Sequence, residues 1–387
     1  MDKNKRGKPQ FSGEWVKLGD VASYINGYAF KPTDYASEGK PIIRIQDLTG
    51  NAYQTNRFAG ILDDKYRVGW GDVLISWSAS LGVYVWSAEE AWLNQHIFKV
   101  QFNKLPVNKR FFIHQTRYVI AESASLAHGA TMRHLTKKVF DNLPFFYPSE
   151  HDQDEIACHL DEIQLQIDSA SEMLVGLDAL VKSRFNEMFG DALNSDNRWP
   201  EQTLGSMLDI ARGGSPRPIK SYLTNDSDGV NWIKIGDAVN GSRYIANTAE
   251  RIKLSGVKKS RLVHSGDFLL SNSMSFGRPY ILKTDGCIHD GWLVLQGVEE
   301  YFDSLFLYQL LASDDMLHKF RGLVRGGVVN NLNKDLVSTV SVMVPPMSMQ
   351  RDFASLVRQV DKLRFDAQQQ IDKLELLKNS LMQEYFG

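Results

Sequence analysis

Short apolar runs bounded by turn residues recur in two stretches of the chain. The runs at 41–45, 72–76 and 96–102, and again at 230–235, 267–271 and 292–296, have the length and composition of β-strands. Segments 108–122 and 303–321 instead have helical spacing, with Asn108 and Asp303 as N-cap residues. Strands and helices are mixed within each stretch, so the sequence predicts two globular domains of the α+β class.

Two further segments carry apolar residues that step alternately by four and three positions, the spacing of a coiled coil. Each stripe extends over about 33 residues, or about 50 Å of helix. We expect the two helices to pack against each other, antiparallel; the alternative is that each folds back on its own domain. The first stripe contains Ile156, Leu160, Ile163, Ile167, Ala170, Leu174, Leu177 and Val181. The second, in which the step slips by one residue in places, contains Phe353, Val357, Val360, Leu363, Ala367, Ile371, Leu374, Leu377 and Leu381.

The two halves of the chain resemble each other. Residues 71–82 read GDVLISWSASLG and residues 266–277 read GDFLLSNSMSFG. The offset between the copies grows from 186 to 197 residues, a period too long for a solenoid or propeller repeat. The chain is therefore a tandem duplication of a globule followed by a helix. Other matching pairs are Leu18 and Leu204, Gly19 and Gly205, Pro148 and Pro345, and Gln153 and Gln350.

The duplication predicts four segments. They are a first globular domain at 1–148, a central helix at 149–190, a second globular domain at 191–346 and a C-terminal helix at 347–387. Antiparallel packing of the two helices would relate the copies by a pseudo-twofold axis. A DNA duplex has the same symmetry when it is read from either strand.

Composition is that of an ordinary core-forming protein, with 43% hydrophobic and 23% charged residues. Two cysteines without CxxC spacing, no apolar run of membrane-spanning length and a polar N-terminus predict a soluble, cytoplasmic protein. The net charge of -2 is unevenly distributed: residues 1–150 carry +5, residues 151–197 carry -9 and residues 198–347 carry +2. Mildly basic globules suit a polyanionic partner, although uneven surface charge alone would also explain the pattern.

A search for catalytic motifs is negative. The sequence contains no GxxxxGK[ST] loop, no GxGxxG turn, no HExxH and no GxSxG elbow. The nine histidines lack metal-ligand spacing. We therefore expect no catalytic residue and no metal site in this chain.

Polar, basic and aromatic residues instead gather in the predicted loops of both copies. Hydroxyl, amide and guanidinium groups can bond phosphates and base edges, while a serine-rich turn would explain part of the pattern equally well. Candidate DNA contacts in the first copy are Lys31, Arg44, Ser76, Trp77, Ser78, Ser80, Thr131 and Arg133. Those in the second copy are Arg217, Lys220, Lys234, Ser271, Asn272, Ser273, Arg278, Arg325, Asn330 and Asn331.

These features together resemble the specificity subunit of type I restriction-modification systems. The resemblance rests on the duplicated globule and helix, the G-D-x-L-x-S-x-S-x-S-x-G segments and the GGT-like loops at 129–131 and 326–328, where Val328 departs from the pattern. It implies that each globule is a target-recognition domain reading half of a bipartite DNA site, with the helices as spacers. It also implies two modification (methyltransferase) and two restriction (motor and nuclease) subunits as partners, with S-adenosylmethionine, ATP and magnesium bound by those partners.

Two other functions fit parts of the sequence. A coiled-coil scaffold that binds only protein would also need the two long helices. An enzyme with a cryptic site, or the specificity module of another modification or restriction enzyme, would share the globules. Duplex binding that weakens steeply with salt separates a DNA reader from a protein scaffold.

Overall fold

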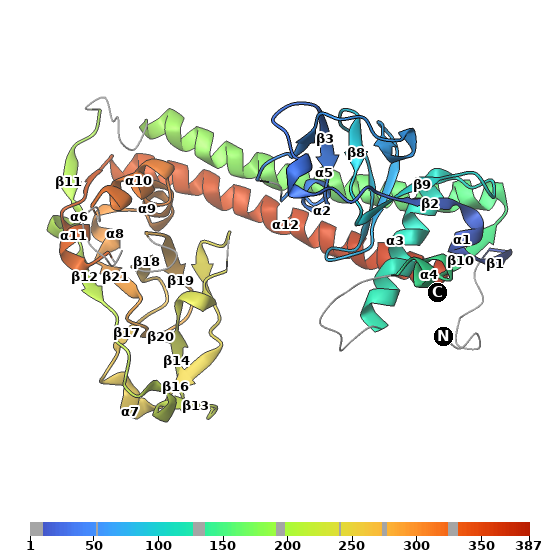
Figure 1. The fold of residues 1–387 in the computed structure, drawn as a ribbon. Helices are drawn as coiled ribbons and strands as arrows, with labels where there is room; N and C mark the ends of the chain where they lie inside the picture. The colour runs from blue at the N-terminus through green and yellow to red at the C-terminus, as the bar shows by residue number, and fades with distance from the viewer. Residues whose placement is uncertain are drawn as a thin grey trace. The chain divides into compact units, whose positions relative to one another are not determined.

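The computed structural model describes residues 11–51, 53–126, 136–190, 198–239, 241–272, 277–323 and 332–387. It contains two compact units, Met1–Ser171 with Gln368–Gly387, and Glu172–Ala367. Two long helices, α5 (Glu150–Phe189) and α12 (Met347–Phe386), each contribute one half to each unit (Figure 1). None of the helices in the described ranges has the length and apolarity needed to cross a membrane.

The first unit contains two sheets, in the strand orders β2-β9-β6-β7 and β4-β3-β8-β5, and a separate pair, β1-β10. The sequence-predicted strands at 41–45, 72–76 and 96–102 are confirmed as β3, β6 and β9. The strands are β1 (Gly13–Lys17), β2 (Ser23–Asn26), β3 (Lys40–Ile43), β4 (Arg57–Phe58), β5 (Arg67–Val68), β6 (Val73–Ser76), β7 (Gly82–Val85), β8 (Ala91–Leu93), β9 (Ile97–Gln101) and β10 (Pro144–Pro148). The helices are α1 (Leu18–Val21), α2 (Ile45–Leu48), α3 (Lys109–Leu126) and α4 (Lys137–Asp141), with short 3₁₀ turns η2 (Pro32–Asp34) and η3 (Asp64–Tyr66).

The largest core of the first unit joins segments from both ends of the chain. Apolar residues of β2, β6, β9 and α3 pack with Ile156 and Leu160 of α5 and with Tyr385 and Phe386 of α12. The Phe386 ring lies 5.7 Å, centroid to centroid, from Phe111 of α3. The last turns of the chain therefore complete the first globule.

The second unit repeats this plan, with sheets β12-β21-β18-β19-β15 and β13-β16-β14-β20-β17 and the pair β11-β22. The predicted strands at 230–235, 267–271 and 292–296 are confirmed as β14, β18 and β21. The strands are β11 (Glu201–Thr203), β12 (Asp209–Arg212), β13 (Leu223–Thr224), β14 (Val230–Ile233), β15 (Tyr244–Ile245), β16 (Glu250–Ile252), β17 (Arg261–Val263), β18 (Phe268–Ser271), β19 (Pro279–Leu282), β20 (Gly286–Ile288), β21 (Trp292–Gln296) and β22 (Ser341–Met343). The helices are α6 (Leu204–Met207), α7 (Leu254–Val257), α8 (Val298–Tyr301), α9 (Ser304–Leu311), α10 (Asp314–Leu323) and α11 (Lys334–Ser338), with 3₁₀ turns η4 (Ile219–Ser221) and η5 (Ile235–Asp237).

The predicted helix at 303–321 is in fact two helices, α9 and α10. Asp303 caps the first, as expected, by accepting the Leu305 N–H at 2.9 Å. The Ser313 hydroxyl then bonds the Leu310 carbonyl at 2.8 Å and accepts the Met316 N–H at 3.3 Å. Ser313 thus ends one helix and caps the next, because a serine oxygen competes for backbone partners. By contrast, α3 begins as predicted, with Asn108 accepting the N–H groups of Arg110 and Phe111.

The two long helices run antiparallel, as expected. In the first unit the N-terminal half of α5 packs on the C-terminal half of α12, and in the second unit the opposite halves meet, with Phe185 against Phe353. The predicted stripe of α5 is buried or half-buried throughout. On α12, Leu363 and Leu377 were placed on the stripe incorrectly, because their side chains are 51% and 48% exposed.

A buried glutamine fastens each globule to its long helix. Gln153 accepts the Asn108 N–H at 2.9 Å and donates to the Pro148 carbonyl at 3.0 Å. Gln350 makes the corresponding bonds with Asp303 at 3.0 Å and Pro345 at 2.9 Å. Both glutamines are fully buried. The matching Gln–Pro pairs of the sequence repeat thus mark a duplicated junction.

Candidate nucleic-acid interface

The serine-rich segments form the connection after β6 and the end of β18. Ser76 and Ser271 are fully buried: the Ser76 hydroxyl donates to the Ser80 carbonyl, and the Ser271 hydroxyl accepts the Arg278 N–H at 2.9 Å. Ser78 and Asn272 are also buried, at 4% and 2% exposure. These four side chains are buried, and those of Ser76 and Ser271 bond the backbone of their own turns, so their assignment as DNA contacts stays a prediction. Ser80 and Arg278 are exposed.

The β6–β7 turn contains a backbone conformation that L-residues rarely adopt. Ala79 has a φ of 55°, in the left-handed region. Next to it, Trp77 is half-buried, stacks on Phe98 with ring centroids 5.9 Å apart and donates from Nε1 to the Asn26 amide oxygen at 3.2 Å. Trp77 therefore positions the exposed Asn26, a residue that the sequence did not single out.

Asp290 is the centre of a polar network in the second unit. Its carboxylate lies 2.7 Å from the Ser215 hydroxyl, 2.9 Å from Nε2 of His289 and 3.7 Å from Nη2 of Arg217. Burial alone would raise the pKa of Asp290, but the Ser215 hydroxyl, His289 and Arg212 outweigh it and hold the pKa below its usual range. The Asp290 carboxylate is therefore ionised at neutral pH and forms an ion pair with the Arg217 guanidinium, whose side chain is 82% exposed.

Two segments that the sequence proposed separately meet beside this network. The Asn272 amide donates to the Asp290 carbonyl at 2.9 Å. The backbone oxygen of Asn272 accepts the N–H of Leu332, the first described residue after the predicted 325–331 contacts, at 3.1 Å. The fold thus brings Arg217, Asn272 and Leu332 to the same side of this network.

The remaining predicted cations are dispersed over the two units. Lys31 and Lys220 are exposed. Arg44 is half-buried and donates to the Gln54 carbonyl at 3.2 Å, while the Lys234 ammonium is paired with Glu250 at 2.8 Å. These positions stay predictions. Thr131, Arg133, Ser273, Arg325, Asn330 and Asn331 lie outside the described residues.

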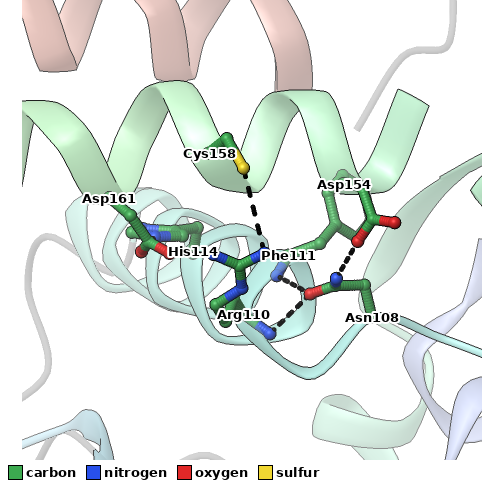
Figure 2. A network of polar contacts seen from close by, with 7 residues as sticks. All are labelled: Asn108, Arg110, Phe111, His114, Asp154, Cys158 and Asp161. Carbon is green, nitrogen blue, oxygen red and sulfur yellow. Dashed lines mark hydrogen bonds and ion pairs between the residues drawn. The ribbon is translucent and has the colours of Figure 1, made fainter. Parts of the chain in front are cut away.

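A second polar network lies between α3 and α5 (Figure 2). Asp161 of α5 lies 2.7 Å from Nε2 of His114 and 3.1 Å from the Arg110 guanidinium. The Asn108 amide donates to the Asp154 carboxylate, which lies about two turns before Asp161 on α5, and Arg110 approaches Cys158 Sγ at 3.9 Å. Asp154 and Asp161 of α5 thus face the N-terminal part of α3.

This network is structural in character. Burial lowers the pKa of His114, and the nearby Asp161 carboxylate opposes that effect without cancelling it. In the part of the chain that the structure describes, no three His, Cys, Asp or Glu side chains are grouped to hold a metal ion. The network links α3 to α5 through Asp161, His114 and Arg110.

Comparison with known proteins defines the class. A family model described as the type I restriction modification DNA specificity domain matches residues 13–174 and 197–376, and the chain belongs to this family. The sequence-based resemblance is therefore confirmed, and each half of the duplication corresponds to one family domain.

Individual relatives agree with this assignment. The chain is 22% identical over 418 residues to the type I restriction enzyme EcoBI specificity subunit of Escherichia coli, covering 99% of this chain and 87% of that protein. It is 20% identical over 390 residues to the MjaVIII specificity subunit of Methanocaldococcus jannaschii, covering 95% and 91%.

Solved structures share the fold. The S subunit of the type I restriction-modification system from M. genitalium superposes with a TM-score of 0.57 at 13% identity, covering 100% of this chain and 98% of that chain. A chain from a structural study of assembly and conformational transition of the type I R-M system gives 0.60 at 18% identity, covering 98% and 99%. The predicted fold class, tandem α+β domains with long helices, is confirmed.

Proposed function

We propose that this chain is the non-catalytic DNA-recognition subunit of a type I restriction-modification complex. Each globular domain reads one half of a bipartite target, and the two long helices set the spacer and dock the modification subunits. The observation that carries this proposal is the duplication itself, with one family domain on each half of the chain. A protein built as two copies of one reader suits a target built as two half-sites.

The chemistry is assigned to partner subunits. Two modification subunits would bind S-adenosylmethionine, and two restriction subunits would bind ATP and magnesium. The support on this chain is the negative search for nucleotide-binding and catalytic motifs in its sequence. We place this DNA-binding complex in the cytoplasm, in line with the sequence-based expectation for the chain.

The proposal is tested by methyl transfer with the components separated. The full chain alone, given S-adenosylmethionine and duplex DNA, should transfer no methyl group. With its modification subunits it should methylate adenine at one bipartite sequence, which is mapped across the host genome with and without this gene. Transfer by the chain alone, or an unchanged methylation pattern without the gene, would overturn the proposal.

The salt dependence of duplex binding distinguishes the proposed DNA reader from a scaffold that binds only protein. Duplex binding by the complex should weaken by orders of magnitude between 50 and 200 mM salt, because phosphate contacts release counterions. An interaction that involves only protein shows no duplex binding at either concentration.

A further inference from the structure

Both units build the same backbone corner where three strands of the main sheet end. In the first unit, Gly27 follows β2 and donates its N–H to the Ile97 carbonyl at 3.2 Å, and Tyr28 donates to the Leu93 carbonyl at 2.8 Å. Trp77, which follows β6, donates its backbone N–H to the His96 carbonyl at 3.4 Å. These bonds tie the ends of β2, β6 and β9 together.

The second unit makes the corresponding bonds. Gly213, after β12, donates to Trp292 at 2.9 Å, and Gly214 donates to Ile288 at 3.1 Å. Asn272, after β18, donates to Gly291 at 2.9 Å. The corner is thus the same feature in each copy.

A glycine is required at the centre of both corners. A Cβ on Gly27 would lie 2.1 Å from the Asn94 carbonyl oxygen, and a Cβ on Gly213 would lie 2.3 Å from the His289 carbonyl oxygen. No L side chain fits against a backbone oxygen at such distances. The duplication has therefore kept the backbone of the corner and the residue that permits it.

The other side chains of the corner differ between the copies. Asn26, Tyr28 and His96 are exposed in the first corner, as is Arg212 in the second. Arg212 donates from Nε to the Asp290 carbonyl at 2.9 Å, and Arg217 extends from the same network into solvent. The pairs are Asn26 and Arg212, Tyr28 and Gly214, Trp77 and Asn272, Asn94 and His289, Gln95 and Asp290, and His96 and Gly291.

We propose that this corner is the base-reading surface of each domain. The inference rests on the proposed function and adds which residues determine sequence preference. One backbone scaffold can read two half-sites of different sequence if its polar side chains differ between the copies. The two corners share their backbone bonds and differ in their polar side chains. In the second domain the exposed guanidinium of Arg217, which lies 3.7 Å from the Asp290 carboxylate, matches the O6 and N7 acceptors of guanine. In the first domain the amide of Asn26, held by Trp77, matches the edge of adenine.

The test selects duplexes from a library of randomised duplex DNA with the full chain bound to its modification subunits. Arg217→Ala should lower the preference for guanine at one position of one half-site by about 5- to 150-fold and leave the other half-site unchanged. Asn26→Ala should lower the preference for adenine at one position of the other half-site and leave the first half-site unchanged. Asp290→Asn, which removes the carboxylate paired with Arg217 and not the guanidinium itself, should reduce the same guanine preference by a smaller factor.

Arg251→Ala is the matched control, because it removes an exposed guanidinium of β16 in the same unit. It should leave both half-site preferences as in the wild type. If Arg217→Ala weakened binding to all duplexes equally, Arg217 would be a phosphate contact and the inference would be wrong. If the wild-type complex selected no sequence at all, the proposed function itself would fail.

Discussion

His114 shows two opposing effects on one titratable side chain. Its ring is buried between α3 and α5, which disfavours the charged form, while Asp161 at 2.7 Å favours it. Burial has the larger effect, so the pKa of His114 in the folded protein lies below its ordinary value of about 6.5. The native state therefore binds fewer protons than the unfolded state as pH falls below that value. The stabilisation from neutral His114 is complete above about pH 6.5 and is lost as pH falls towards the folded-state pKa.

The melting temperature of the chain should therefore decrease between pH 7 and pH 5.5, and His114→Gln should make that decrease smaller. A glutamine can still donate to Asp161 but does not titrate. Thermal unfolding followed by circular dichroism at a series of pH values measures the slope. His264→Gln, at a histidine whose side chain is 66% exposed, should retain the wild-type slope. An equal slope in His114→Gln and wild type would show that His114 does not contribute to it.

At the scale of single residues, the sequence points to segments that form the proposed corners, and the side chains that contact DNA stay predictions. Arg217 and Trp77 were named in advance and both lie at the corners. Ser76 and Ser271, also named as candidate contacts, are buried as the last residues of β6 and β18. Asp290, His289 and Asn26 were not named. Their importance depends on strands being brought together by pairing, which no local pattern contains.

At the scale of the helix, the seam of α12 is more regular than its apolar residues suggest. The seam continues through Arg364 and Lys378 in steps of three and four, while Leu363 and Leu377 point to solvent. Arg364 pairs with Asp178 and Lys378 bonds Gln164, so each long stem covers the seam and its polar head finds a partner on α5. The sequence analysis considered only apolar residues and therefore predicted one-residue slips in the stripe. The buried and half-buried positions of α12 keep a regular spacing of three and four residues.

Two alanine substitutions in the first unit test whether the seam of α12 passes through Lys378, as in the structure, or through Leu377, as the apolar pattern predicted. Ile371→Ala should lower the free energy of unfolding by about 2–4 kcal/mol, because Ile371 is 7% exposed and its loss leaves a cavity in the seam. Leu377→Ala should change it by less than about 0.5 kcal/mol. Urea denaturation of the full chain measures both. An equal loss of unfolding free energy in the two variants would show that Leu377 is part of the seam.

At the scale of the whole molecule, the helices are proposed to act as a ruler between half-sites. Inserting one heptad after Leu174 and one after Ile371, which are equivalent positions of the duplication, preserves the seam and lengthens each helix by about 10 Å. That length corresponds to roughly 3 base pairs at 3.4 Å each. Genome-wide methylation mapping should then show both half-site sequences unchanged and a longer spacer. An unchanged spacer, or new half-sites, would mean that the helices do not set the distance.

The completion of the first core by Tyr385 and Phe386 has a consequence for how the protein is made. When the ribosome has synthesised Met1–Ser171, the apolar face of α5 around Ile156 and Leu160 still lacks the chain segment that will cover it. That segment follows about 200 residues later, which at roughly 5–20 residues per second is a delay of about 10–40 s. During this time the apolar residues that Tyr385 and Phe386 contact in the complete chain lack these partners. The first domain to be synthesised is therefore the last to be finished.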